Sequence, residues 1–218
     1  MQWVINTYGR QPFLLLVACL LSLRARDRMV QKIIPALFER VRTPQDMCAL
    51  SLQETEKIIR SIGFYVRKAQ QLHDVAQALL DSFDGRVPQT MDEMLSIKGI
   101  GRKTANLVLW YAYGIAGIAV DVHVHRISNR LGLVHTKTPE QTEQALMQCL
   151  PKKLWPEVNR LFVLWGQRVC LPRKPLCDSC PLLRDCEHVT HVSARSTCAP
   201  VRRTTVPAPV RRHRGNAR

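Results

Sequence analysis

A turn rich in glycine and cations is the segment of this sequence best suited to chemistry. Its residues are Lys98, Gly99, Ile100, Gly101, Arg102 and Lys103. Helix-forming residues follow at once, so the backbone N–H groups of the turn lie at the positive end of a helix dipole. That geometry binds phosphate, and glycine is needed wherever a Cβ would block the turn or the approach of a ligand. The turn therefore predicts a contact with a polyanion, unless it is only a helix–helix loop with solvated lysines.

Four cysteines farther along the chain have a spacing suited to a metal ion or a cluster. They are Cys170, Cys177, Cys180 and Cys186, in the pattern C-x6-C-x2-C-x5-C. Four thiolates from one short loop can hold a tetrahedral zinc ion or a [4Fe–4S] cluster. Structural zinc usually draws on two separated C-x2-C pairs, and this loop has only one. The spacing therefore favours iron–sulfur and leaves zinc as the alternative.

Two cations lie between the first two of these cysteines. Arg173 and Lys174 are flanked by Pro172 and Pro175, which restrict the backbone on either side. A short, rigid loop that presents two positive charges predicts a second phosphate contact. The alternative is a pair of cations that is merely solvated.

The charge of the 218-residue chain points to a polyanionic partner, of which nucleic acid is the commonest. Lys and Arg number 32 against 17 Asp and Glu, a formal net charge of +15. Residues 189–218 contribute seven arginines and no acidic residue, so the rest of the chain still carries +8. That final segment is rich in Arg, Pro, Ser and Thr, and we predict a disordered basic tail.

The pattern of apolar residues predicts an all-α fold. Apolar side chains recur at helical spacing over 72–83 and again over 158–165, and both stripes are expected to lie in a core. No convincing alternation of period two is present. Helix starts are predicted at two capping boxes and at two Thr-Pro pairs, namely Ser51–Glu54, Thr90–Glu93, Thr43-Pro44 and Thr138-Pro139.

The apolar run over residues 13–21 is predicted to be a buried helix. It resembles the apolar core of a signal peptide, but it is too short to span a bilayer. It also continues into a charged helical pattern with no clean cleavage site, so no membrane association is expected. The other four cysteines are scattered, which indicates a reducing, intracellular compartment rather than a disulfide framework.

Taken in order, these motifs resemble those of the endonuclease III family. The hairpin from Gly99 to Ala105, then Val120-Asp121-Val122-His123, then the cysteine loop follow one another between about Pro12 and His188. The family comprises the helix-hairpin-helix DNA glycosylase/AP lyases of base-excision repair. The resemblance implies two helical domains with a DNA-binding cleft between them and one structural [4Fe–4S] cluster held by the four cysteines.

The resemblance also implies how the chain is divided into domains. A six-helix domain would occupy residues 5–115, with the helix-hairpin-helix motif at about 90–113. The cluster domain would combine residues 116–188 with the first few residues, and 189–218 would form the tail. A further N-terminal helix of the family has no counterpart here, so we expect some surface of the cluster domain to be uncovered.

The implied reaction begins when a damaged base, expected to be an oxidised pyrimidine, is flipped out of the duplex. Lys103 would attack the sugar C1′, expel the base and form a Schiff base, and β-elimination would then cleave the abasic site. Neighbouring cations and the helix N-terminus favour the neutral, nucleophilic form of this amine. Asp121 would stabilise positive charge on the sugar and assist proton transfer, or cap a helix from Val122, or do both.

Arg24 departs from the family pattern, because it occupies the position of a glutamine that helps to fill the hole left by the flipped base. The resemblance assigns four residues to the base pocket or to this wedge, namely Ser22, Arg24, Asp27 and His123. Arginine can also plug a duplex, so the preferred base stays open. Lys98 likewise replaces the usual proline of the hairpin and adds a charge.

Three other functions compete with this interpretation. An adenine-mismatch glycosylase would lack the lysine at position 103, and a thymine or uracil mismatch glycosylase would retain the lyase architecture. A catalytically silent DNA-binding protein would use the hairpin and the cluster for structure alone. In each case the expected partner is double-stranded DNA, here containing a damaged base or an abasic site. The protein is expected to be a monomer in the cytoplasm or nucleoid.

Overall fold

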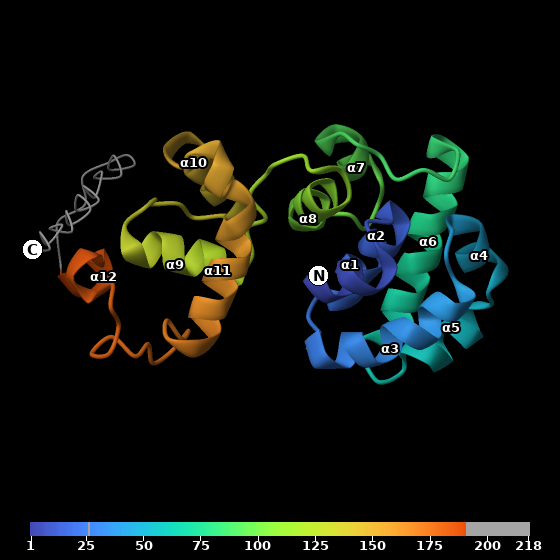
Figure 1. Cartoon of the computed structure of the whole chain (residues 1–218), viewed down its shortest axis with the longest axis horizontal. Coiled ribbons are helices and arrows are strands. Elements are labelled where there is room, and N and C mark those ends of the chain that lie inside the picture. Colours follow the sequence, from blue (N-terminus) through green and yellow to red (C-terminus); the bar gives the residue numbers. More distant parts are fainter. Residues whose placement is uncertain (26, 191–218) are drawn as a thin grey trace, which may run out of the picture.

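The computed structural model describes residues 1–25 and 27–190, and within that part every regular element is a helix (Figure 1). The prediction of an all-α fold is therefore confirmed. The predicted basic tail, from residue 191 onward, lies outside the described residues.

The first lobe contains eight helices, grouped on the right of Figure 1. Their bounds are α1 Gln2–Tyr8, α2 Pro12–Ser22, α3 Asp27–Arg40, α4 Pro44–Ala49, α5 Leu52–Ile59, α6 Tyr65–Phe83, α7 Met91–Ser96 and α8 Arg102–Tyr113. Helix α2 lies at the centre and packs against α1, α3, α6 and α8. Every residue from 13 to 21 is buried, so the apolar run is a core helix as predicted. None of the described helices is both long and apolar enough to cross a bilayer.

The second lobe contains four helices and two short 3₁₀ turns, on the left of Figure 1. Their bounds are α9 Val122–Leu131, α10 Pro139–Cys149, η1 Lys152–Leu154, α11 Trp155–Arg168, η2 Leu183–Asp185 and α12 Glu187–Thr190. A smaller apolar cluster, separate from that of the first lobe, holds it together. Among the described helices, every pair that packs extensively belongs to one lobe or the other. The lobes are joined by residues 114–121.

The first residues of the chain belong to the first lobe, which differs from the prediction that they join residues 116–188. Val4 of α1 is buried in the larger core. The Tyr8 ring makes edge-to-face contacts with Trp3 and with Phe38 of α3. Apolar contacts with α2 and α3 therefore hold α1 against the larger core.

The helix starts follow the predicted capping residues closely. Ser51 and Glu54 form a reciprocal capping box at α5, and Thr138 caps α10 with Pro139 in its first turn. Thr43 caps α4, where Asp46 completes a box that the sequence interpretation had not included. Thr90 caps α7, but the Glu93 carboxylate accepts a hydrogen bond from the Thr90 hydroxyl and not from the Thr90 backbone N–H. The predicted reciprocal capping box is therefore wrong there.

The two predicted apolar stripes differ in depth. On α6, Leu72, Val75, Ala76 and Leu79 are buried as predicted. Of the predicted stripe on α11, Val158 is buried but Leu161 is 49% exposed, so the core prediction is wrong for the Leu161 side chain. The reason is that α11 packs against α9 through the face that carries Gly166, where a Cβ would overlap the ring of His123.

Candidate active site

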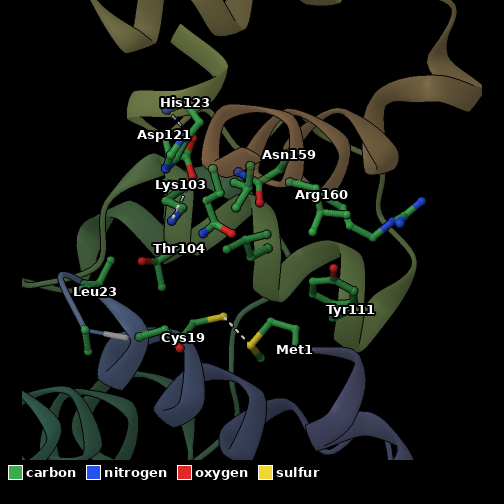
Figure 2. A pocket seen from close by; sticks show the side chains of 16 residues that line it. Met1, Cys19, Leu23, Lys103, Thr104, Tyr111, Asp121, His123, Asn159 and Arg160 are labelled. Atoms are coloured by element: carbon green, nitrogen blue, oxygen red, sulfur yellow. Dashed lines mark hydrogen bonds and ion pairs between the residues drawn. The ribbon is translucent and has the colours of Figure 1, made fainter. Parts of the chain in front are cut away.

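Lys103 and Asp121 face each other in a pocket between the two lobes. The Lys103 Nζ lies 3.7 Å from the Asp121 Oδ2, and the two side chains are 36% and 13% exposed. The pocket has a volume of about 340 Å³ and is lined by α2 and α8 of the first lobe and by α9 and α11 of the second. Figure 2 shows the pair on one wall of this pocket, with Met1 and Cys19 across from it. The arrangement places an amine beside a carboxylate at a composite, water-accessible site.

Asp121 is held by the start of its own helix. Its Oδ1 accepts hydrogen bonds from the backbone N–H groups of His123 (2.9 Å) and Val124 (3.0 Å), so it is the N-cap of α9. The other oxygen, Oδ2, is the one that faces Lys103. One carboxylate thus caps a helix with one oxygen and turns the other toward the pocket.

The glycine turn fixes where α8 begins, and so where Lys103 lies. Gly99 has a φ of +98°, which L-residues with a side chain rarely adopt, and its carbonyl accepts a hydrogen bond from the Gln71 side chain. Ile100 is buried and anchors the turn to the core. Gly101 is the N-cap of α8, is exposed, and supplies no side-chain cap. The N-cap of α8 thus offers its first N–H groups no capping side chain and lies at an open surface, as a phosphate site requires.

The cations of the turn point to different partners. Lys98 is exposed beside Gly99, which suits a phosphate contact. Arg102 instead donates from Nε and Nη2 to the buried carboxylate of Glu143, at 2.9 and 2.8 Å. This hydrogen-bonded pairing raises the pKa of Arg102 above its ordinary value. The predicted trio of cations is thus split, and Arg102 has an internal partner.

Two of the residues assigned to the base pocket line the same cavity as Lys103. They are Ser22, whose hydroxyl donates to the Ala18 carbonyl, and His123. Burial lowers the pKa of His123, and nearby cations lower it further against the opposing effect of Asp121. Asp27 begins α3, but its side chain lies outside the described part of the structure.

Cys19 is a second potential nucleophile in this pocket. Its thiol is buried and lies 4.0 Å from the Met1 sulfur. Burial raises the pKa of Cys19 to about 12, so the thiol keeps its proton at neutral pH. Because the thiolate is the reactive form of cysteine, burial leaves this thiol unreactive.

Arg24 lies outside this pocket and shares a second cavity with Phe64, a residue that the sequence interpretation had missed. The two line one cavity, and both have left-handed backbone, with φ values of +52° and +61°. Phe64 is 60% exposed although it is aromatic. A large residue held in this conformation is strained. The signal in the sequence was an aromatic directly before α6, where a polar N-cap is usual.

Lys68 supports the segment from which Arg24 projects. Its ammonium is buried and donates to the carbonyls of Leu20 and Leu21 in the last turn of α2 and to that of the C-cap residue Leu23. Burial lowers the pKa of Lys68 to about 8. A buried cation therefore caps α2 and fixes the loop just before Arg24.

The four cysteines Cys170, Cys177, Cys180 and Cys186 line one cavity of the second lobe. Burial raises the pKa of Cys186, and the three other thiols add to the effect because they lie close by. Within the described residues, no group of three or more His, Cys, Asp or Glu side chains is arranged to hold a metal ion. The four thiols share one cavity without being arranged as a metal site.

Arg130 of α9 holds the start of the cysteine loop. Its guanidinium donates to the Cys170 sulfur at 3.4 Å and to the carbonyls of Leu171 and Pro172. The next two residues, Arg173 and Lys174, are exposed. The two cations are therefore exposed to solvent on a loop whose start is anchored by Arg130.

Comparison with known proteins relates this chain to DNA repair enzymes. The model of the family described as "HhH-GPD superfamily base excision DNA repair protein" matches residues 17–152. Endonuclease III of Thermotoga maritima is 44% identical over 182 residues, which cover 84% of this chain and 85% of that protein.

Two solved structures are similar in fold. A non-covalent endonuclease III–DNA complex has a TM-score of 0.77 and 40% identity, over 83% of this chain and 85% of its own. A trapped endonuclease III–DNA covalent intermediate, an estranged-adenine complex, has a TM-score of 0.77 and 37% identity, over 87% and 92%. The similarity covers both lobes.

Proposed function

The chain belongs to the endonuclease III family of the HhH-GPD superfamily, and we propose that Lys103 is the nucleophile of its DNA glycosylase/AP lyase activity. The observation that carries this proposal is the pairing of Lys103 Nζ with Asp121 Oδ2 in a pocket between the lobes. Borohydride reduces a lysine Schiff base to a stable amine, so covalent trapping of the protein on an abasic duplex tests it.

In the proposed reaction the damaged nucleotide is flipped from the duplex into the pocket. The neutral amine of Lys103 forms a bond to C1′ as the glycosidic C–N bond breaks, and the base leaves with that electron pair and takes up a proton. Opening of the sugar ring gives the Schiff base. Removal of a C2′ proton then expels the 3′ phosphate. The Asp121 carboxylate stabilises positive charge on the sugar and lies where it can accept protons.

Two surfaces are proposed to hold the DNA backbone. At the first, Lys98 and the exposed N–H groups of the turn at Gly99 and Gly101 bind phosphates, with Ile100 as the buried anchor. At the second, Arg173 and Lys174 bind phosphates from the cysteine loop. The partner is duplex DNA with a damaged base or an abasic site, bound by a monomer inside the cell.

Arg24 and Phe64 are proposed as the wedge that replaces the flipped nucleotide, and the expected substrate is an oxidised pyrimidine. We expect Arg24→Ala and Phe64→Ala each to slow excision from duplex DNA by about tenfold or more, because unstacking costs a few kcal/mol. Excision from single-stranded DNA, where no hole must be filled, should change far less. Single-turnover excision from a panel of lesions, each opposite all four bases, measures both effects.

The matched control is Arg86→Ala, an exposed arginine just beyond the other end of α6 from Phe64. Equal losses on duplex and single-stranded substrates would contradict the wedge. If the protein excises only mismatched thymine, uracil or adenine from the panel, the substrate is a mismatched base and not an oxidised pyrimidine. Arg24→Gln is expected to shift the preference for the opposite base.

We propose that Cys170, Cys177, Cys180 and Cys186 hold one [4Fe–4S] cluster, because their spacing and the cavity they share suit a cluster. The cluster would serve as a structural link that keeps the Arg173–Lys174 loop in place. Protein purified without oxygen is expected to be brown and to contain about four iron and four sulfide ions per chain. Cys180→Ala should lose the iron, whereas Cys48→Ala, on α4 of the other lobe, should retain it. Colourless protein with stoichiometric zinc would overturn the assignment.

A further inference from the structure

Glu143 of α10 is a buried carboxylate that joins the two lobes. It is 3% exposed, and both of its oxygens accept hydrogen bonds from the first lobe. Arg102 donates to them at 2.9 and 2.8 Å, and the Asn106 side chain donates to Oε1 at 3.1 Å. Arg102 and Asn106 are four residues apart, so they lie on one face of α8. Glu143 therefore binds one face of the helix that carries Lys103.

The same stretch of α10 also binds the helix that carries Asp121. Thr142, the neighbour of Glu143, is buried, and its hydroxyl lies 2.6 Å from the His125 Nδ1 on α9. His125 is one turn beyond Asp121, the N-cap of α9. Two adjacent residues of α10 thus connect to α8 and to α9, which carry the amine and the carboxylate of the site.

The segment 114–121, which joins the lobes, also contacts this cluster through Asn106. Asn106 also donates to the Ile118 carbonyl at 3.2 Å, and a Cβ at Gly117 would overlap the Asn106 side-chain oxygen. Few other contacts could set the geometry between the lobes, because the described helices pack extensively only within each lobe. The position of Lys103 relative to Asp121 therefore depends on a small polar cluster.

We propose that Glu143 is a positioning residue for the lyase reaction, and that Arg102 serves this clasp rather than a DNA phosphate. The clasp of Arg102, Asn106 and Glu143 holds α8 and α9 so that Lys103 Nζ meets Asp121 Oδ2. This inference rests on the proposed function of Lys103. A shift of about 1 Å between reacting groups can lower a rate by about 10²-fold, so a loosened clasp acts on the chemical step.

The test compares Glu143→Gln and Arg102→Lys with the wild-type protein in single-turnover trapping on an abasic duplex, at temperatures where all are folded. Both should lower the rate at saturating DNA by about tenfold or more. The dissociation constant for the duplex should change by less than about threefold. Lysine keeps the charge of Arg102 and still binds phosphate, but it lacks the planar fork that fits a carboxylate. A loss seen only as weaker DNA binding would therefore restore Arg102 to the phosphate contacts and overturn the clasp.

The matched control is Glu54→Gln, which alters an Arg–Glu pair of the same 2.8 Å length on the surface of the first lobe. Its trapping rate should equal that of wild type. If Glu143→Gln is less stable but traps at the wild-type rate, the Arg102–Glu143 pair only stabilises the fold, and the positioning role is overturned. Where Glu143→Gln does not fold, Arg102→Lys decides the question.

Hydrogen exchange separates this proposal from the one it rests on. Amides of residues 114–121 should exchange faster in Glu143→Gln than in wild type, whether or not the protein cleaves DNA. If wild-type protein fails to trap abasic DNA, the role of Lys103 is lost, and exchange alone then tests the clasp. Unchanged exchange in this segment would overturn it.

Discussion

Lys103→Ala is expected to abolish covalent trapping on abasic DNA and to lower base excision by several orders of magnitude. Loss of a covalent nucleophile removes on the order of 10⁴- to 10⁶-fold of kcat where the intermediate is obligatory. The fold should persist, because the Lys103 side chain is partly exposed and Asp121, with which it forms an ion pair, still caps α9. Borohydride trapping followed over time, with a parallel excision assay on a lesion duplex, measures both losses.

Lys98→Ala is the matched control, since it removes a lysine from the same turn without touching the pocket. DNA binding should weaken uniformly, and its salt dependence should fall by about one phosphate contact. At saturating DNA the trapping rate should stay near that of wild type. Trapping by Lys103→Ala at the wild-type rate would exclude Lys103 as the nucleophile, because another amine would then form the Schiff base.

Asp121→Asn is expected to lower the chemical rate by about 10²- to 10⁴-fold with little change in stability. The reason is the division of labour between the two carboxylate oxygens. Asparagine caps helices about as well as aspartate, so its Oδ1 can still accept from the N–H groups of His123 and Val124. The charge next to Lys103 is lost, and with it the stabilisation of the sugar cation.

Asp121→Ala separates the two roles, because it removes the cap as well as the charge. It should cost about 1 kcal/mol of stability in addition to the activity lost by Asp121→Asn. Thermal unfolding and single-turnover excision of the two variants, side by side, measure the difference. An active Asp121→Asn protein would show that the carboxylate is needed only as a cap.

The parts of the site that could be predicted from the sequence are those fixed by local rules. A glycine turn before a helix and an aspartate before Val122 each have one common geometry, and the structure has both. Four cysteines within one loop must lie near one another, and they line one cavity. Local rules of chain geometry were thus enough to predict most residues of the candidate site.

The parts that could not be predicted depend on distant partners. Arg102 looked like a phosphate ligand because its neighbours do, but its partner lies 41 residues away on another helix. Leu161 fitted an apolar stripe and is nonetheless exposed, because the packing of α11 decides which face is covered. Phe64 could not be identified as a site residue from the sequence, because only the structure shows its left-handed backbone and the cavity that it shares with Arg24.

The division of the pocket between two separate cores has a consequence for a chain that is still being made. Domains generally fold as units, the N-terminal one first, so the lobe with Lys103 and the glycine turn forms before the lobe with Asp121. A half-synthesised protein therefore carries the glycine turn and Lys103 without the second lobe, and the pocket between the lobes is complete only once α9 and α11 have folded.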